Sequence, residues 1–213
     1  KHKLDVVGAF TAQNRRGDHM GMSGRGYLDD NVTYYNMDAI VDKRCLTSTT
    51  TSWMEKRFSV LARANYSYGG RYHLTITGRG DAAANFARGH QWAFFPAAAF
   101  KWTISNESWM QMAKGTWLSN LALRLSAGRS GNDSVASYVS QAALTNGVST
   151  WLFGDSQQLS YAPSRLDNKG LTWEKTDSYN LGIDMSILQG RVEITADGYL
   201  SRTTDLLLQV KNA

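Results

Sequence analysis

The chain has 213 residues, enough for one large domain or two small ones. Its formal net charge is +5, but no run of five or more basic residues occurs, so the composition argues against a nucleic-acid-binding protein. The single cysteine, Cys45, excludes an internal disulfide, and without a Cys/His cluster we expect no structural zinc site.

Aromatic residues and glycine are abundant, whereas proline is scarce. Ten Tyr, seven Trp, seven Phe and nineteen Gly stand against two Pro, which favours long antiparallel strands. No segment approaches the roughly 20 consecutive apolar residues of a membrane helix, but a transmembrane β-strand needs only about 9–11 residues. No signal peptide precedes the first apolar segment, so we expect the chain to start inside a longer coding sequence.

Alternation of apolar and polar residues predicts seven strands, at residues 4–13, 55–68, 71–81, 92–104, 118–129, 172–187 and 191–204. The pattern is clearest within 57–68. There one parity is apolar and the other is polar except for Leu61; the apolar residues are Phe58, Val60, Ala62, Ala64, Tyr66 and Tyr68. Because successive side chains of a strand point to opposite faces, this strand has one apolar and one polar face.

The strand at 92–104 has Trp92 near one end of its apolar row and Trp102 near the other, which is typical of the aromatic girdles at two membrane interfaces. In 172–187, Lys175 and Asp177 share the parity of the apolar row. A charge on a lipid-facing position is costly at the bilayer midplane. We therefore expect this strand to enter the bilayer near Tyr179.

Connections between the predicted strands alternate in length. The turns at 69–70 and 188–190 are tight. The connection at 105–117 lies on the same side of the sheet as these turns, and we expect a short helix in it after Asn106. The longer connections are 14–52, 82–91 and 130–169. Short turns on one side and long loops on the other are typical of outer-membrane barrels. The sequence predicts an all-β, antiparallel, up-and-down transmembrane β-barrel segment of about seven strands over residues 1–213, an incomplete barrel.

Five stretches, in order, resemble the SusC/RagA-type TonB-linked outer-membrane transporters. They are 63–68 (RANYSY) with 71–77 (RYHLTIT); 79–81 (RGD) with 92–97 (WAFFPA); 102–107 (WTISNE); 117–128 (WLSNLALRLSAG) with 130–132 (SGN); and 171–184 (LTWEKTDSYNLGID) with Arg191 and 203–207 (TTDLL). The chain departs from the family at 81–86 (DAAANF), where a Ser-rich loop is usual.

This resemblance implies a transporter in the outer membrane of a Gram-negative bacterium. Such a protein imports oligosaccharides or peptides through a plugged barrel, is powered by the TonB complex, and works with a SusD-like lipoprotein; outer-membrane lipid surrounds it. The family barrel has 22 strands. The plug domain, the TonB box and the C-terminal strands of the family are not in this sequence, so we expect a fragment of the wall that does not transport alone.

The sequence points to no enzyme and no cofactor, because it contains no nucleophile–base arrangement, no glycine-rich phosphate loop and no HExxH motif. Glu174 beside Trp173 is suggestive of a glycosidase carboxylate, but a carboxylate facing the barrel lumen is the better interpretation. Asp184 is expected to pair with a lumen arginine, either Arg124 or Arg191.

Trp151 and Phe153, in the predicted long loop 130–169, are the best candidates for substrate contact, since aromatic rings stack on sugars and on peptide side chains. Packing of that loop against its neighbours is the alternative. Asp29, Asp30 and Asp155 could bind calcium, although solvated loop positions explain them better.

A different fold class remains open at this point. A soluble β-sandwich carbohydrate-binding module would bury each apolar face between two sheets. Phe58, Ile76, Leu123 and Ile183 would then pack in one closed core. A porin or barrel enzyme would require a complete set of closing strands.

Overall fold

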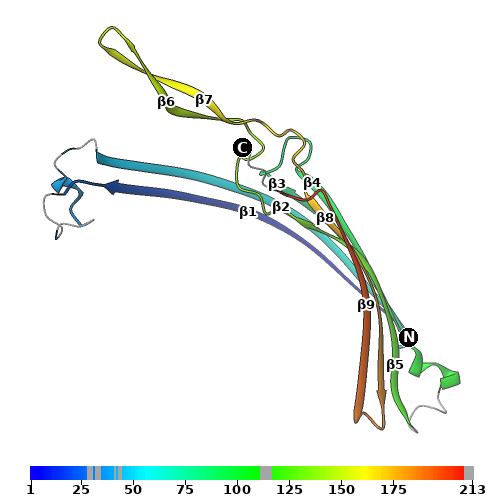
Figure 1. Ribbon diagram of the computed structural model, residues 1–213. Coiled ribbons are helices and arrows are strands. Elements are labelled where there is room, and N and C mark those ends of the chain that lie inside the picture. The colour runs from blue at the N-terminus through cyan, green and yellow to red at the C-terminus, as the bar shows by residue number, and fades with distance from the viewer. Residues whose placement is uncertain (28–30, 32–34, 41, 43–44, 111–116, 209–213) are drawn as a thin grey trace. The chain divides into compact units, whose positions relative to one another are not determined.

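The computed structural model describes residues 1–27, 31, 35–40, 42, 45–110 and 117–208 (Figure 1). The strands are β1 (His2–Gly24), β2 (Leu46–Tyr68), β3 (Tyr72–Ala83), β4 (Trp92–Thr103), β5 (Leu118–Asn132), β6 (Ala143–Phe153), β7 (Ser156–Arg165), β8 (Glu174–Ile187) and β9 (Val192–Thr204). Three short 3-10 helices are η1 (Met37–Ala39), η3 (Ile104–Asn106) and η4 (Ser108–Met110). Among the described residues, no helix is both long and apolar enough to span a membrane.

Seven strands form one sheet in the order β1-β2-β3-β4-β5-β8-β9, and β6 pairs only with β7 in a separate hairpin. Neighbouring strands from β2 to β9 run antiparallel. The chain thus passes up and down through adjacent strands, with the β6–β7 hairpin inserted between β5 and β8. The predicted antiparallel seven-stranded barrel segment is confirmed.

Tight turns join β2 to β3 and β8 to β9, at what we call the turn end of the sheet. Gly69 and Gly70 have φ of +61° and +66°, the left-handed conformation that suits the two central residues of a tight turn, which the Arg71 N–H closes by donating to the Tyr68 carbonyl at 3.0 Å. Between β8 and β9, Leu188, Gln189 and Gly190 also have positive φ. The opposite end, where longer connections follow β3 and β5, is called the loop end.

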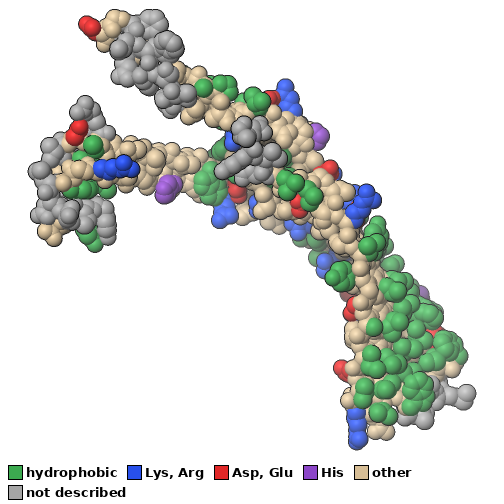
Figure 2. Space-filling view, viewed as in Figure 1, with side chains coloured by type: hydrophobic (Ala, Val, Ile, Leu, Met, Phe, Trp, Pro, Cys, Tyr) green, Lys and Arg blue, Asp and Glu red, His purple; other side chains and the backbone are tan. Residues whose placement is uncertain are grey.

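The register brings apolar side chains of neighbouring strands onto one face, called the apolar face. One row runs Leu74–Phe100–Leu125–Leu181 through four adjacent strands. Phe58, Ile76 and Ile183 on this face are 38%, 54% and 46% exposed, and Leu123 is half-buried. Figure 2 shows hydrophobic side chains gathered over the end of the sheet where β5 is labelled in Figure 1. These exposed side chains do not form the closed core that a soluble β-sandwich requires, so the β-sandwich alternative is contradicted.

The chain divides into two compact units, one of residues 1–13 with 57–213 and the other of 14–56. In the second unit, the Arg15 guanidinium lies 5.5 Å from the centre of the Trp53 ring. Ile40 is buried and forms an isolated β-bridge with Tyr27.

Three predicted connections differ from the structure. Strand β1 continues to residue 24 and β2 begins at 46, so much of the predicted loop 14–52 is strand. Residues 47–52 are all Thr or Ser, which gives no apolar period although threonine itself favours strands. The predicted loop 130–169 contains β6 and β7.

The helix expected after Asn106 is replaced, over the described residues, by the 3-10 helices η3 and η4. Asn106 ends η3, and its side-chain amide donates to the Gly70 carbonyl at 2.8 Å. Asn106, the expected helix cap, therefore holds the connection 104–110 against the tight turn between β2 and β3.

Candidate functional site: the polar face of the sheet

Opposite the apolar face, polar side chains pair across strands; this is the polar face. Between β2 and β3, the Arg63 Nε donates to Thr77 Oγ1 at 3.2 Å and Thr75 Oγ1 donates to Asn65 Oδ1 at 2.9 Å. Between β8 and β9, the hydroxyls of Ser178 and Ser201 lie 3.1 Å apart. The two members of each pair satisfy each other's hydrogen-bonding groups across neighbouring strands, and the face stays hydrophilic.

Arg124 joins three strands in the middle of the polar face. Its Nε and Nη2 donate to the two carboxylate oxygens of Asp184 at 2.8 and 2.9 Å, and its Nη2 lies 3.1 Å from Asp197 Oδ1. Gly182 lies between them, and a Cβ at that position would collide with the Asp197 carboxylate and the Arg124 guanidinium. Arg124, rather than Arg191, is thus the partner of Asp184, and Gly182 leaves room for the planar group.

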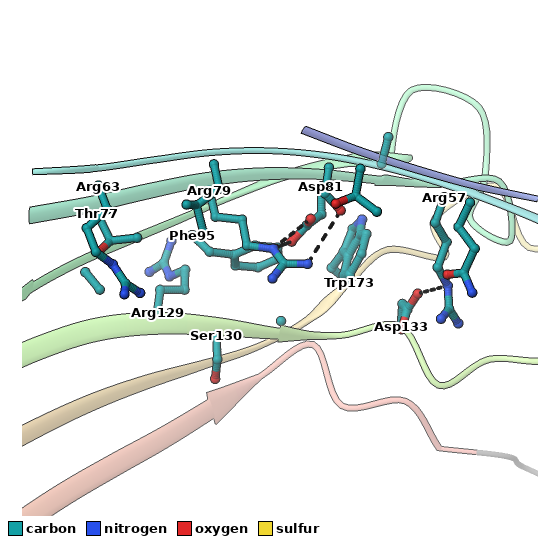
Figure 3. Close-up of a pocket in the computed structure, with 17 residues that line it drawn as sticks. Arg57, Arg63, Thr77, Arg79, Asp81, Phe95, Arg129, Ser130, Asp133 and Trp173 are labelled. Carbon is teal, nitrogen blue, oxygen red and sulfur yellow. Dashed lines mark hydrogen bonds and ion pairs between the residues drawn. The ribbon is translucent and has the colours of Figure 1, made fainter. Parts of the chain in front are cut away.

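A cavity of about 540 Å³ lies on the polar face toward the loop end (Figure 3). Its lining includes Arg63 and three arginines held by carboxylates, one of which is Arg129, paired with Asp177. Arg79 Nε donates to both oxygens of Asp81 at 2.9 and 2.7 Å, and Arg57 Nε lies 2.8 Å from Asp133 Oδ2. Such a cavity presents oriented guanidinium donors, which suit hydroxyl, carbonyl and carboxylate groups of a polar solute.

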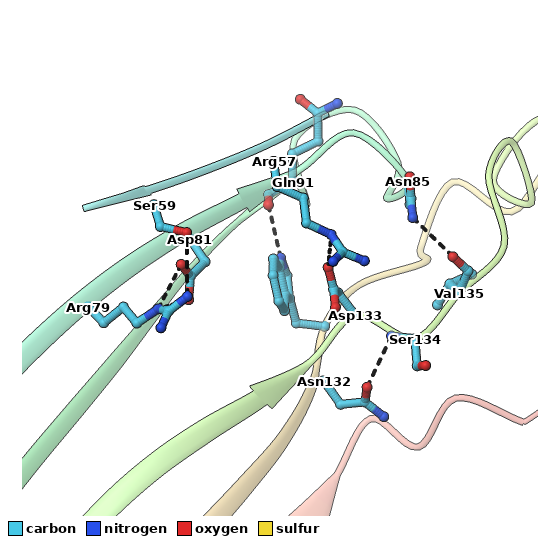
Figure 4. A network of polar contacts seen from close by, with 11 residues as sticks. Arg57, Ser59, Arg79, Asp81, Asn85, Gln91, Asn132, Asp133, Ser134 and Val135 are labelled. Atoms are coloured by element: carbon cyan, nitrogen blue, oxygen red, sulfur yellow. Dashed lines mark hydrogen bonds and ion pairs between the residues drawn. The ribbon is translucent and has the colours of Figure 1, made fainter. Parts of the chain in front are cut away.

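Aromatic packing closes the loop end of this cavity. Phe86, Phe95, Trp173 and Ala83 form the buried core cluster of the described residues. Trp173 Nε1 donates to the Gln91 carbonyl at 2.9 Å. As Figure 4 shows, the Asn85 side chain points to the Val135 carbonyl, to which it donates at 3.0 Å. The connections after β3 and β5 and before β8 are therefore tied together.

Sequence reasoning missed this cluster. Phe95 has the parity of the polar face, and Trp173 precedes the predicted membrane span, so the alternation rule assigned neither to a core. The signal in the sequence was the doublet Phe94-Phe95, where one aromatic has to face the polar side. Gly131 also contributes, because any side chain there would collide with the Phe95 ring.

Glu174, the candidate catalytic carboxylate, holds strands together. Its Oε2 accepts from the Leu207 backbone N–H at 3.1 Å and its Oε1 accepts from Asn132 Nδ2 at 3.2 Å. The Leu207 N–H and then the Asn132 amide lower the pKa of Glu174 below that of an ordinary glutamate. A glycosidase acid needs a raised pKa instead, so this geometry suits a structural carboxylate.

At the turn end, Glu107 is buried and accepts hydrogen bonds from three side chains. The donors are the Tyr72 hydroxyl at 2.6 Å, Trp102 Nε1 at 3.1 Å and Arg71 Nη1 at 3.0 Å. The hydrogen bond from Tyr72, followed by that from Trp102, lowers the pKa of Glu107. Glu107 thereby fastens the connection after β4 to the start of β3.

We expect the stabilisation from Glu107 to depend on pH. A lowered pKa means that the carboxylate stabilises the fold above its unfolded pKa of about 4.3, and that this contribution is lost as the pH falls through the lower, folded pKa. The melting temperature of the full-length protein in detergent should therefore exceed that of Glu107→Gln near pH 7, and the gap should shrink toward pH 3. A gap that stays constant over this range would contradict the assignment.

The structure describes only the backbone of Trp151 and Phe153, the two residues predicted to contact the substrate. The backbones of Trp151 and Phe153 lie in β6, paired with Gln158 and Ser156. Their side chains lie outside the described part of the structure. Asp29 and Asp30 also lie outside the described residues, and Asp155 lies in the turn between β6 and β7. Within the described part of the chain, no group of three or more His, Cys, Asp or Glu residues could hold a metal ion.

Known proteins with similar sequences are bacterial receptors. The chain is 35% identical over 156 residues to the TonB-dependent receptor SusC of Bacteroides thetaiotaomicron, a match that covers 72% of this chain and 15% of that protein. It is 30% identical over 210 residues to the TonB-dependent receptor P26 of Formosa agariphila, covering 98% of this chain and 21% of the relative. The chain thus spans about a fifth of the length of such relatives.

A solved structure shares the fold over the whole chain. The structure of the RagAB peptide transporter superposes with a TM-score of 0.84 at 25% identity, covering 100% of this chain and 23% of that one. The family model described as TonB dependent receptor-like, beta-barrel matches residues 3–213. This chain therefore belongs to the TonB-dependent receptor β-barrel family, within which it is similar to SusC and to the RagAB transporter.

Proposed function

We propose that residues 1–213 form part of the barrel wall of a TonB-dependent transporter in the outer membrane of a Gram-negative bacterium. The observation that carries the proposal is the exposed apolar face, continuous through neighbouring strands, opposite a hydrogen-bonded polar face. In a barrel, the apolar face contacts lipid and the polar face lines the lumen.

The aromatic residues of β4 fit the thickness of a membrane. Trp92 and Trp102 lie ten residues apart on the apolar face, about 33 Å along a strand at roughly 3.3 Å per residue. A tilt of about 40° reduces this to about 25 Å across the membrane, the height of the apolar band of outer-membrane barrels. Tyr72 stacks beside Trp102, with ring centres 6.3 Å apart, which widens the aromatic band at the turn end.

By this proposal the full-length protein imports oligosaccharides or peptides, with energy from the TonB complex and with a SusD-like lipoprotein at the loop end. Support comes from the identity with SusC and from the fold shared with a protein described as a peptide transporter. Trp151 and Phe153, on the hairpin inserted at the loop end, contact the substrate. The arginine-lined cavity contributes polar contacts along the passage.

Uptake of labelled oligosaccharides and peptides by cells that carry the full-length protein tests this function. We expect uptake of one of these classes, and its loss when TonB is inactivated. Replacing Trp151 or Phe153 by Ala should raise the half-saturating substrate concentration about fivefold, the equivalent of roughly 1 kcal/mol of ring stacking. Tyr161→Ala is the matched control, since Tyr161 lies on the same hairpin and is 67% exposed. Uptake independent of TonB would contradict the proposal.

A further inference from the structure

Charge is unevenly distributed in the cavity at the loop end of the polar face. Of the described residues, four arginines and two carboxylates line it: Arg57, Arg63, Arg79, Arg129, Asp81 and Asp133. Asp177, which lies outside the lining, adds a third carboxylate by pairing with Arg129 at 2.7 Å. The cavity therefore keeps an excess of positive charge when its paired groups are counted.

Arg63 is held by a hydroxyl rather than by a carboxylate. Its Nε donates to Thr77 Oγ1, its register partner in β3, at 3.2 Å, and the residue is exposed. A guanidinium has five N–H donors, so this hydrogen bond orients the group and leaves its terminal nitrogens for other acceptors. Arg63 therefore brings an oriented positive charge to the cavity.

Arg79 lies beside Arg63 on the same face of the sheet. It is two residues beyond Thr77 in β3, which makes Arg63 and Arg79 diagonal neighbours about 7–8 Å apart. Asp81 accepts from the Arg79 Nε, and 51% of the Arg79 side chain stays exposed. Figure 3 shows the side chains of Arg57, Arg63 and Arg79 leaving β2 and β3 on one side. The terminal nitrogens of Arg63 and Arg79 can thus donate to one carboxylate of a solute.

Short side chains leave space between these arginines and the loops. Strands β4 and β5 are paired only as far as Ala97 with Gly128. Beyond that pair, Ser130 and Gly131 of β5 line the cavity together with Ser59 of β2. A hydroxyl both donates and accepts, so Ser59 and Ser130 suit the hydroxyls of a sugar ring. The volume of about 540 Å³ is within the range of small-molecule sites.

We propose that this cavity binds acidic oligosaccharides through the carboxylates of their sugars, so that the transporter selects sugar acids over neutral sugars. Arg63 and Arg79 contact a carboxylate, and the serine hydroxyls contact ring hydroxyls. A planar guanidinium matches a carboxylate in geometry and in charge. The inference rests on the proposed function, and it narrows the two classes of solute named there to one.

A peptide suits the same cavity less well. Its terminal ammonium group needs an acceptor, but Asp81 and Asp133 already accept from Arg79 and Arg57. The ammonium group would also meet the excess of positive charge. An oligosaccharide of sugar acids carries only negative charge and hydroxyls, so every polar group of the solute has a complementary group in the cavity.

Titration calorimetry of the full-length protein in detergent tests the site. The probes are tetramers of galacturonic, glucuronic and mannuronic acid, each also as its uncharged methyl ester. We expect at least one acid to bind about tenfold tighter than its ester, and Arg63→Gln to remove most of this preference without changing the binding of the ester. Raising the salt concentration should weaken binding of the acid to wild type but not that of the ester, which tests the charge without any substitution.

Arg191→Gln is the matched control for Arg63→Gln. It removes the same charge from an exposed residue at the turn end, outside the lining of the cavity. This variant should bind the acid as wild type does. Arg63→Gln leaves Asp81 and Asp133 with their own arginines, so it is not expected to disturb the fold of the cavity.

Three results would overturn the acidic-sugar site: equal affinity of wild type for every acid and its ester, tighter binding of tetra-alanine than of any acid, or unchanged affinity in Arg63→Gln. Uptake by cells then separates the two proposals. If uptake of neutral oligosaccharides or of peptides depends on TonB and the acids are not preferred, the cavity assignment is wrong and the transporter assignment stands. If wild type is absent from the outer membrane, both proposals fail.

Discussion

Ile183→Arg is expected to destabilise the folded barrel by about 2–4 kcal/mol, the cost of a basic side chain on the lipid face near the bilayer midplane. Ile183 lies centrally in the apolar face, in a register row with Leu123 of β5 and Ala196 of β9. It is 46% exposed, so the arginine would lie in hydrocarbon rather than disturb a packed core. The free energy of unfolding of the full-length protein in lipid vesicles, from denaturant titration, measures the effect.

Thr195→Arg is the matched control. Thr195 is exposed on the polar face, is the register partner of Asp184, and lies next to the carboxylates that Arg124 bridges. An arginine there meets water and negative charge, so the unfolding free energy should change far less than in Ile183→Arg. Equal destabilisation by the two substitutions would mean that the two faces are wrongly assigned.

Trp173→Ala should have the second large effect, a loss of about 3–5 kcal/mol from the packing at the loop end. Trp173 is buried against Phe86 and Phe95, with ring centres 4.9 and 5.5 Å away, and its ring N–H binds the Gln91 carbonyl. Its removal leaves a cavity, and the Gln91 carbonyl keeps only the hydrogen bond from the Ala83 N–H at 3.1 Å. Because these contacts hold the connections at the loop end against β4, we expect faster amide hydrogen exchange in residues 84–91, with little change at the turn end.

Trp109→Ala provides the comparison for this experiment. Trp109 is 62% exposed in η4, at the turn end, and forms no part of the buried cluster. Its substitution should leave hydrogen exchange in residues 84–91 unchanged. If Trp173→Ala also leaves that exchange unchanged, the cluster does not hold the loops together.

Much of the sheet was predictable from the sequence because a barrel strand is defined locally. The two-residue period assigns each side chain to a face without knowledge of its neighbours, as in 57–68, where the apolar parity matches the exposed face of β2. Gly69-Gly70 specified the hairpin turn in the same way, since both positions need positive φ. The pairing of Asp184 with Arg124 was one of two predicted options, and only the register of β5 with β8 decided between them.

The local period, turn residues and charge parity thus determined the strand direction, the two faces and the family to which the chain belongs. Tertiary structure decided the rest. Residues 14–24 and 46–52 lie in β1 and β2 because a neighbouring strand supplies backbone partners, not because their side chains alternate. Trp173 and Phe95, 78 residues apart, meet only after the sheet has brought β4 and β8 near each other. Contacts that join distant segments leave no periodic trace in either segment, so no local pattern could predict them.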